Sequence, residues 1–458
     1  MSDGYSTHTT ATERRIRELL EAQQLNELRA LVNDEYAPDL ADVLERLDED
    51  EQLKVFGLLE IDMAIDVLHE LGRQATRHIL SGIPAARVGD LLDEMPMDDA
   101  ASILIEDVPD MQEEFLAEME PADAAEVRDL LQYPPKSAGR LMTEKFARIR
   151  PEATVQDVMA HLRKIDPEVE TISDVYALDP QGRLAGVASL RQLVTADPQQ
   201  RIREIMATDL ITVAPDTDQE DVARLVARYD FLAIPVVTSD LRMLGIITVD
   251  DVIHVLVEES AEDALRFGGV EGAVGLISQP YFTVPLNKVI RSRLGWLLLL
   301  FVAETFTGMV LRGYESQLAQ VTALSFFIPL LIGTGGNTGA QTVSTIIRAL
   351  ALKEVRLSDG MRVLAREMGS GLLLGTLLGT VGFFRALLWG SGFGLSLVVG
   401  LSVLAICAWA NTIGSLIPLI ATRFKIDPAI VSAPLITTLV GATGLAIYLT
   451  IATIILRL

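Results

Sequence analysis

The sequence predicts a multi-domain fold: an all-α superhelical N domain, an α/β pair of repeated units, a linking helix and an all-α membrane domain with five helices. Three observations lead to this fold class. Charged residues nearly vanish from long apolar runs after Leu294. A helix-sized motif recurs through residues 13–133, and a β-rich unit occurs twice within residues 137–257. Residues 1–12, which are rich in Ser and Thr, are expected to be disordered.

The N domain, residues 13–133, is expected to be a stack of short amphipathic helices. Its repeated motif includes Asp39-Leu-Ala-Asp-Val-Leu, Val88-Gly-Asp-Leu-Leu and Asp99-Ala-Ala-Ser-Ile-Leu. Such an array presents carboxylates in rows. The period alone leaves open whether the rows bind ions or only solvate the stack.

The two repeated units span residues 137–200 and 201–257. Each combines a helix, at 154–164 or 218–229, with two strand-like segments. This duplication resembles a tandem CBS pair, a module that commonly binds adenine nucleotides or metal. The resemblance makes Thr248 and Asp251, with Arg191, the candidates for ATP or another adenine nucleotide; capping of the following helix is the alternative role for Thr248.

Five apolar stretches in residues 291–458 each approach or exceed the roughly 20 residues that cross a bilayer. They are residues 294–312, 321–350, 367–389, 395–421 and 429–456. Basic residues gather in the loops on one side, so the positive-inside bias places residues 1–290 in the cytoplasm. Because no signal peptide opens the sequence, we expect a multi-pass protein of the cytoplasmic (inner) membrane. A linking helix at 258–290 is expected to join the soluble part to the membrane part.

Composition narrows the function. The formal net charge is −25, so cations are natural partners and nucleic acid is not. The single cysteine and the five scattered histidines provide neither a disulfide framework nor a zinc cluster. No nucleophile–base pair stands out, and the glycine-rich run at 333–339 lacks the Lys-Ser/Thr ending of a phosphate loop, so an enzyme is not expected.

A polar segment interrupts the second apolar stretch. It carries Asn337, Thr338, Gln341 and Thr342 among glycines. Because an unsatisfied polar group in hydrocarbon costs several kcal/mol, these side chains must face neighbouring helices or water. The segment therefore predicts a path for an ion.

The order of these parts resembles the MgtE family of magnesium channels, with Gly333-Thr-Gly-Gly-Asn-Thr-Gly-Ala-Gln341 and Asp427-Pro-Ala-Ile-Val-Ser-Ala-Pro-Leu-Ile-Thr-Thr438 as the most specific matches. The resemblance implies a homodimer in the lipid bilayer whose central pore is lined by spans two and five. It also implies a cytoplasmic domain that binds intracellular Mg²⁺ and closes the pore. Mg²⁺ prefers oxygen ligands with waters retained, which suits Asn337, Thr338, Gln341, Thr437 and Thr438.

One departure concerns the pore carboxylate. The family has an aspartate where this chain has Gly441, and loss of that charge would weaken capture of a divalent ion. Glu304 in span one is the other acidic candidate, because an ionisable group inside a membrane is a functional candidate by default. A protonated or hydrogen-bonded glutamate near the end of the span is the alternative for Glu304.

A regulatory Mg²⁺ network is the second candidate site. Carboxylates that face each other across domain interfaces repel, and Mg²⁺ between them would stabilise a closed assembly. The candidate ligands are Asp93, Asp98, Asp99, Asp216, Asp218, Asp251, Glu259, Glu262 and Asp263. By the resemblance, the family has an acidic residue at the position that His254 occupies in this chain.

Three functional hypotheses follow. The first is a Mg²⁺-gated channel that imports Mg²⁺, and the second is a transporter of another divalent ion such as Co²⁺. The third, suggested by Gly441, is a non-conducting membrane sensor of Mg²⁺ or nucleotide.

Overall fold

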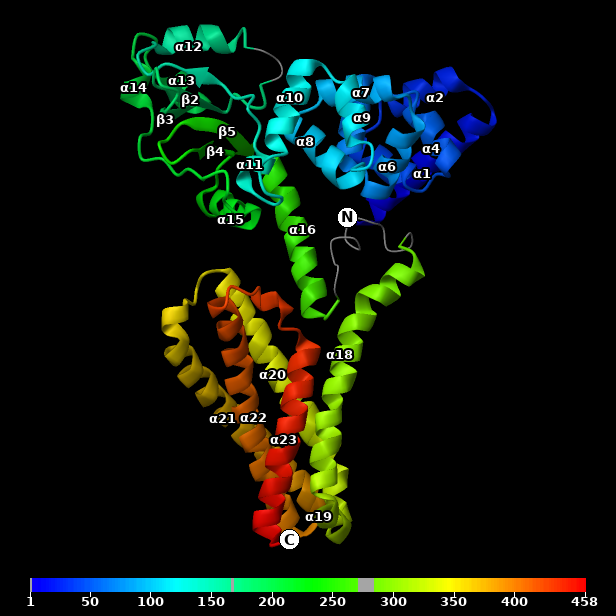
Figure 1. Ribbon diagram of the computed structural model, residues 1–458, viewed down its shortest axis with the longest axis vertical. Helices are drawn as coiled ribbons and strands as arrows, with labels where there is room; N and C mark the ends of the chain where they lie inside the picture. The colour runs from blue at the N-terminus through cyan, green and yellow to red at the C-terminus, as the bar shows by residue number, and fades with distance from the viewer. Residues whose placement is uncertain (1, 166–168, 271–283) are drawn as a thin grey trace. The chain divides into compact units, whose positions relative to one another are not determined.

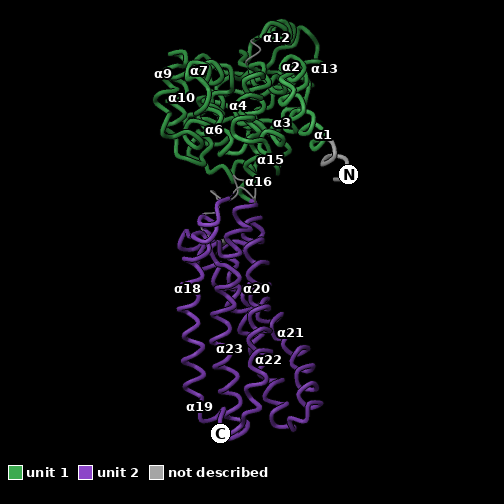
Figure 2. The backbone as a smooth tube through the Cα atoms, turned by 90° about the vertical axis from the view of Figure 1, so that its right-hand side faces the viewer, with its two compact units in different colours: residues 1–259, 278–280 green, residues 260–277, 281–458 purple. Residues whose placement is uncertain are grey.

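The computed structural model describes residues 2–165, 169–270 and 284–458. They form two compact units, one reaching to Glu259 and one made of the described residues from Ser260 onward (Figure 2). The first unit holds the helical N domain and the two β-containing repeats, and the second holds the long membrane helices (Figure 1). This architecture confirms the predicted fold class.

The N domain is an array of short helices around a continuous apolar core. Local signals begin several of them: a capping box of Asp48 and Glu51 starts α4, and proline stands in the first turn of α3 and α10. The helices are α1 Ser2–Glu21, α2 Leu25–Val32, α3 Ala37–Leu44, α4 Glu49–Phe56, α5 Ile61–Glu70, α6 Arg73–Gly82, α7 Ala85–Glu94, α8 Met97–Ser102, a π-helical turn Ile103–Asp107, α9 Gln112–Glu118 and α10 Pro121–Leu130.

Helix α1 includes residues 2–12, for which the composition predicted disorder. Within this stretch Thr9 is 1% exposed, and the Thr12 hydroxyl donates to Glu35 Oε2 at 3.3 Å. Packing on the following helices therefore orders polar residues that have little helix preference of their own.

The two repeats have matching elements. The first contains α11 Ala138–Leu141, β1 Arg148–Ile149, α12 Val155–Leu162, β2 Asp174–Leu178, β3 Leu184–Ser189 and α13 Leu190–Thr195. The second contains α14 Ile202–Ile205, α15 Gln219–Tyr229, β4 Ala233–Val237, β5 Met243–Thr248 and the start of α16 Val249–Phe267. Strand β1 pairs with β2 in parallel, and β2–β3 and β4–β5 are antiparallel pairs. Side-chain caps at Thr154, Ser189 and Asp218 start α12, α13 and α15.

Helix α16 is continuous from Val249 to Phe267, so the expected boundary at residue 258 lies inside one helix. Most of the remaining predicted linking segment, residues 271–283, lies outside the described residues. The next described helix, α18 Leu286–Gly313, already belongs to the membrane part.

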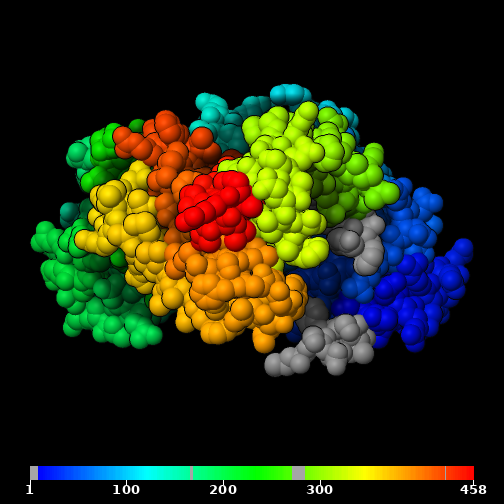
Figure 3. Space-filling view, turned by 90° about the horizontal axis from the view of Figure 1, so that it is seen from below, coloured from blue at the N-terminus to red at the C-terminus, as the bar shows by residue number. Residues whose placement is uncertain are grey.

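Five long helices build the membrane part: α18, α20 Ile328–Ala351, α21 Gly360–Leu388, α22 Gly392–Arg423 and α23 Ala433–Leu456. Short helices α19 Glu315–Gln320 and Thr322–Phe327 precede α20, so this helix begins later than the predicted span. Among the described residues, the four other long helices are apolar enough to cross a membrane. At the end of the unit, the last turn of α23 lies beside α18 (Figure 3).

Candidate ion path and regulatory cation site

The polar segment lies on α20, and the helix divides its side chains between two faces. Asn337 and Gln341 are exposed in the single chain, one helical turn apart. Thr338 and Thr342 are buried, at 7% and 5% exposure. Their hydroxyls donate to the carbonyls of Thr334 and Thr338, so their polar atoms are satisfied within the helix. The structure therefore leaves Asn337 and Gln341, rather than the two threonines, open to an ion.

Glycines bring α23 against α20. A Cβ on Gly336 would lie 2.7 Å from Thr437 Cγ2, and a Cβ on Gly339 would lie 2.8 Å from Ile436 Cγ2. Thr437 is exposed beside this contact, and its hydroxyl donates to Ala433 O. Thr438, the next residue, is half-buried. The predicted spans two and five are thus neighbours, and the exposed Thr437 lies against the glycine that precedes Asn337.

Gly441 is buried one turn further along α23. A Cβ built there would lie 3.3 Å from Ile332 Cγ2 of α20. A side chain at this position would therefore start between α20 and α23, and only Ile332 would have to move by a few tenths of an ångström. Glu304 does not share this place: it is exposed on α18, which packs mainly on α23.

The sequence did not predict a polar pair that lies between α21 and α22. Asn411 is 2% exposed, and its Nδ2 donates to Glu367 O at 3.1 Å, with Glu367 Oε2 at 3.5 Å. Its Oδ1 is buried without a hydrogen-bond partner among the described residues. Glu367 was placed at the edge of a span, but α21 begins at Gly360 and carries it two turns inside the helix. An asparagine in an apolar stretch was the available signal.

An acidic cluster joins the N domain to the repeats within the first unit. Asp98 and Asp99 come from α8, Asp251 from α16, and Glu170 from the segment before β2. His69 of α5 completes it, with Nδ1 3.3 Å from Asp99 Oδ2. Asp98 is 7% exposed, and its Oδ1 has no hydrogen-bond partner in the described residues. These are segments far apart in the sequence that fold into one negative site.

Burial and repulsion between carboxylates dominate the electrostatics of the cluster. Burial and the nearby Asp99 carboxylate raise the pKa of Asp251 to about 7. The same two causes raise the pKa of Asp98 well above its usual range. The hydrogen bond to Asp99 raises the pKa of His69 to about 9, so an imidazolium offsets part of the charge. A divalent cation would stabilise the carboxylates in the same way, and the orphaned Asp98 oxygen fits this role.

The other predicted Mg²⁺ ligands lie elsewhere. Asp93 accepts hydrogen bonds from Glu120 N, Asp218 caps α15, and Asp216 is exposed in the loop before it. Glu259 accepts from Lys136 Nζ at 2.9 Å and from Gln219 Nε2 at 2.8 Å. Glu262 and Asp263 belong to the second unit, where Glu262 pairs with Arg266. Among the described residues, no three His, Cys, Asp or Glu side chains already hold the geometry of a metal centre.

The candidate nucleotide residues do not converge. The Thr248 hydroxyl donates to Asp251 Oδ2 at 2.9 Å, which is a local bond at the start of α16. Arg191 is exposed on α13, and no hydrogen bond joins it to Thr248 or Asp251 among the described residues. Ser189 and Gln192 form a capping box, as expected for a helix start.

A helical array, a duplicated α/β module and a membrane bundle with one polar helix define a membrane transport protein with an attached soluble part. Comparison with known proteins identifies its family. Residues 328–451 match the MgtE divalent cation transporters, residues 36–136 match the MgtE intracellular N domain, and residues 138–198 and 202–258 match CBS domains. The chain belongs to the MgtE family, which confirms the resemblance found in the sequence; its members are transporters rather than enzymes.

The relatives span nearly the whole chain. The magnesium transporter MgtE of Thermus thermophilus is 38% identical over 445 residues, 96% of this chain and 98% of that protein. The magnesium transporter MgtE of Bacillus subtilis is 32% identical over 435 residues, 95% of each. The crystal structure of the cytosolic domain of the Mg²⁺ channel MgtE in complex with ATP has a TM-score of 0.51 at 36% identity, and covers 53% of this chain and 99% of that one.

Proposed function

We propose that this chain forms a homodimeric channel that imports Mg²⁺ and is closed when Mg²⁺ binds its cytoplasmic part. The observation that carries transport is the polar face of α20. Asn337 and Gln341 are exposed in the single chain, although α20 stands among helices apolar enough to span a membrane. Lipid cannot satisfy these amides, so a second copy facing this side, with water and ions between, accounts for them.

Neutral amides suit hydrated Mg²⁺. The ion dehydrates reluctantly and keeps several bound waters. These waters can donate hydrogen bonds to amide and hydroxyl oxygens. Asn337, Gln341 and Thr437 supply these groups from α20 and α23. The names of the relatives support Mg²⁺ as the cargo, and Co²⁺ is the nearest competitor.

Closure by Mg²⁺ is proposed from the cluster of Asp98, Asp99 and Asp251. Mg²⁺ there would tie the N domain to the second CBS unit by neutralising carboxylates from both. Asp99→Asn and Asp251→Asn should each weaken the Mg²⁺-induced protection of α8 from hydrogen exchange. Exposed Asp216 provides the matched control, because it lies outside the cluster.

An adenine nucleotide is a second proposed ligand, supported by the ATP complex of the related cytosolic domain. The Thr248–Asp251 hydrogen bond would have to open for this pair to hold a ribose. Calorimetric titration of the chain with ATP, beside Arg191→Ala and Thr248→Ala, tests which repeat binds it.

The experiment for transport is Mg²⁺ uptake into liposomes that contain the purified chain. Asn337→Ala should reduce uptake, whereas Thr380→Ala, an exposed threonine on α21, should not. Cross-linking in the same liposomes tests the dimer. Equal uptake by native protein and Asn337→Ala would reject this ion path.

Gly441 favours one second candidate, a non-conducting sensor. In that case native protein shows no uptake and Gly441→Asp does, because the carboxylate restores ion capture. Uptake by the native chain rejects the sensor.

A further inference from the structure

An open pocket of about 560 Å³ lies in the first CBS repeat, between helix α12 and the carboxyl ends of β1 and β2. Strand β1 pairs in parallel with β2, so Arg150 just after β1 and Leu178 at the end of β2 lie at the same edge of the sheet. Helix α12 contributes Asp157 and His161, which are one turn apart on the same face. The volume is that of a site for a small organic molecule.

This pocket is at the opposite end of the sheet from the candidate nucleotide residue of the first repeat. In the antiparallel pair of β2 and β3, Leu178 is opposite Leu184. At the other end of the same pair, Asp174 is opposite Ser189, and Arg191 follows Ser189. A strand rises about 3.3 Å per residue, so the span from Asp174 to Leu178 is about 13 Å. The pocket is therefore separate from the surface that Arg191 occupies.

Two arginines line the pocket from β1. Arg148 and Arg150 are two positions apart in extended chain, so both side chains leave the same side, and Ile149 between them is buried. Both arginines are exposed. For the Arg150 side chain, no hydrogen bond or ion pair is found within the described parts of the chain. The Arg150 guanidinium is therefore available to a ligand.

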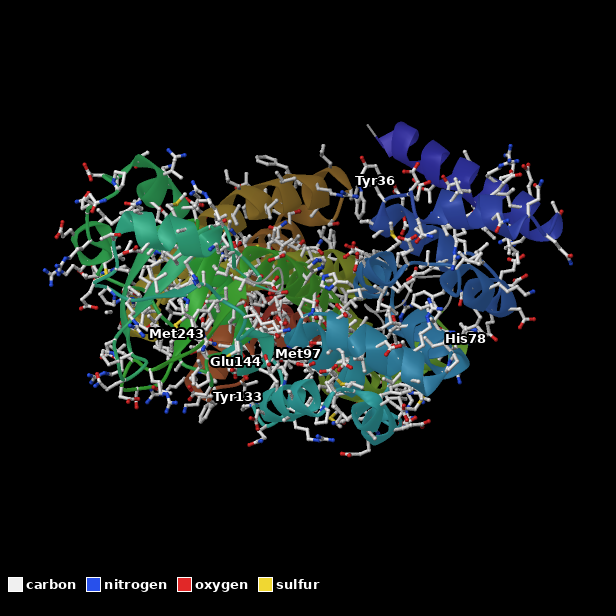
Figure 4. All side chains as sticks on the ribbon, turned by 90° about the horizontal axis from the view of Figure 1, so that it is seen from above. Tyr36, His78, Met97, Tyr133, Glu144 and Met243 are labelled. Atoms are coloured by element: carbon white, nitrogen blue, oxygen red, sulfur yellow. The ribbon has the colours of Figure 1, made fainter. Side chains whose placement is uncertain are left out.

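Arg148 is held in place from the segment between α11 and β1. Its Nη2 donates to Glu144 O at 2.9 Å, and its Cζ lies 4.6 Å from the centroid of the Phe146 ring. Seen from above, Glu144 lies between Met243 of the second repeat and His78 of the N domain (Figure 4). A guanidinium that is already positioned loses less rotamer freedom when a ligand binds, which favours affinity.

The two carboxylates that line the pocket already accept hydrogen bonds from their own segments. Asp179 pairs with Arg183, whose Nε lies 2.9 Å from Asp179 Oδ2, and it also accepts from the backbone amide of Gln181. Asp157 accepts from Thr154 Oγ1 at 2.7 Å in the capping box of α12. Within the described residues, Asp157 is thus the one lining carboxylate without an ion pair, and two arginines face it. This balance of charge favours an anion.

We propose that this pocket binds a small organic anion. Its phosphate or carboxylate head lies between Arg148 and Arg150, because a planar guanidinium matches the oxygens of either group through paired hydrogen bonds. Its apolar body lies against Leu178 and Pro180, at the end of β2 and in the turn after it. The site goes beyond the proposed transport and cation binding, since it shares no residue with the ion path or with the acidic cluster.

A ligand in the pocket acts on the contact between the two repeats. The turn after β2, which carries Pro180, is bonded to the second repeat. Met243 N donates to Gly182 O at 3.0 Å. Leu184 N donates to Leu241 O at 2.9 Å. A ligand that packs on Pro180 stabilises this turn, and the CBS pair therefore responds to an organic anion.

Phenyl phosphate is the probe for this site, because it joins a phosphate head to an apolar ring. The experiment is a saturation-transfer NMR titration of phenyl phosphate with the full chain in detergent. A second arm uses benzoate, so that the two dissociation constants distinguish a phosphate head from a carboxylate head. We expect saturable binding at millimolar concentration that inorganic phosphate weakens by competition and that phenol, which lacks the head group, does not reproduce.

Substitutions of exposed residues locate the site. Arg150→Gln should raise the dissociation constant about tenfold, because a charged hydrogen-bond donor is lost. Asp157→Asn should lower it by about twofold to fivefold, since the repulsion disappears while the amide oxygen can still cap α12. Arg163→Gln removes the same charge from the C-terminal end of α12, outside the pocket, and should leave binding unchanged. Arg191→Ala should also leave it unchanged.

The result has clear opposite outcomes. Absence of saturable binding of both probes, or equal binding by the native chain and Arg150→Gln, overturns the proposal. Loss of binding in Arg163→Gln or Arg191→Ala would place the probe elsewhere and overturns it as well. With the pocket filled, hydrogen exchange of the Leu184 and Met243 amides should slow. Unchanged exchange would reject the effect of the ligand on the contact between the repeats.

Discussion

At the scale of single residues, Gly441 is the position at which we propose that the ion path lacks a carboxylate. It is buried on α23, and a side chain there would start toward Ile332 on α20. The sequence identified the missing carboxylate from the family pattern alone. The sequence could not show which way a side chain at position 441 would point. That direction depends on how α20 and α23 pack, and Ile332 and Gly441 are 109 residues apart in the chain.

The substitution Gly441→Asp should strengthen ion capture. A charged hydrogen-bonding group contributes about 1.5–3 kcal/mol, which corresponds to about tenfold to a hundredfold in affinity. The Cβ contact of 3.3 Å with Ile332 Cγ2 asks only for a small shift of a flexible side chain. Competition of Mg²⁺ against a fluorescent divalent tracer in liposomes measures this change, with Gly441→Ala as the steric control. An Asp variant no better than the Ala variant would contradict it.

The polar residues of α20 lie on two different faces of the helix, and the sequence could not predict which of them are exposed. Asn337, Thr338 and Gln341 were assigned together to the ion path, and the structure exposes Asn337 and Gln341 but buries Thr338. Helical spacing fixes which residues share a face. Which face meets α22 depends on tertiary packing, and no local pattern encodes it.

At the scale of elements, glycines set the distance between α21 and α22. A Cβ on Gly375 would lie 2.8 Å from Leu404 backbone atoms, and one on Gly379 would lie 2.5 Å from Gly400 O. Close approach of small residues is how membrane helices gain packing without a hydrophobic drive between them. The two helices therefore depend on the absence of these side chains.

Gly379→Ala should destabilise the membrane unit by about 1–3 kcal/mol, because backbone atoms rather than a flexible side chain must move. Gly369→Ala on the same helix meets nothing within 4 Å and should be neutral or slightly stabilising. Thermal unfolding of both variants in detergent compares them directly. Equal melting temperatures would show that the α21–α22 contact tolerates a methyl group.

The end of α16 is docked within the second unit by charge and shape. Arg266 Nη1 donates to Asp427 Oδ2 at 2.5 Å, and Arg266 also pairs with Glu262, which is 2% exposed. Gly269 has a φ of +77°, and an added Cβ would lie 2.5 Å from Trp296 Cδ1. The predicted linking helix is therefore attached to the loop before α23 at its C-terminal end.

Arg266→Ala should release this end of α16. Loss of one partner from a partly buried ion pair costs about 1–3 kcal/mol, so hydrogen exchange of residues 260–267 should accelerate by about fivefold or more. Arg362→Ala removes an exposed pair with Asp359 in the same unit and should have almost no effect. Unchanged exchange in Arg266→Ala would mean that packing alone holds the helix.

At the scale of the whole molecule, composition and repeats predicted the architecture, because periodicity and charge are local properties of the chain. The CBS duplication, the helical array and the polar membrane helix were all visible in this way. The membership of the acidic cluster was not, since His69, Asp98, Glu170 and Asp251 come from four separate segments. Of nine proposed Mg²⁺ ligands, the structure gathers Asp98, Asp99 and Asp251. Asp218 instead caps its own helix, and Glu259 accepts a hydrogen bond from Lys136.

The cluster also predicts how pH acts on the chain without divalent ions. Asp251, with a pKa raised to about 7, supports the packed state below its ordinary value of 3.8 and loses that support as pH rises through 7. His69, raised from 6.5 to about 9, supports packing below 6.5 and loses it as pH rises through 9. Both groups therefore weaken the contact of the N domain with the repeats as pH increases.

Limited proteolysis of the Mg²⁺-free chain should accordingly be slower at about pH 5.5 than at about pH 8.5, after correction for the activity of the protease. Millimolar Mg²⁺ should shrink this difference, because the cation neutralises the carboxylates that protons neutralise at low pH. Asp251→Asn should flatten the part of the profile below pH 7 and leave the His69 part. Faster cleavage at the lower pH would mean that the cluster is stabilised by its negative charge, and would also argue against a cation bound between its carboxylates.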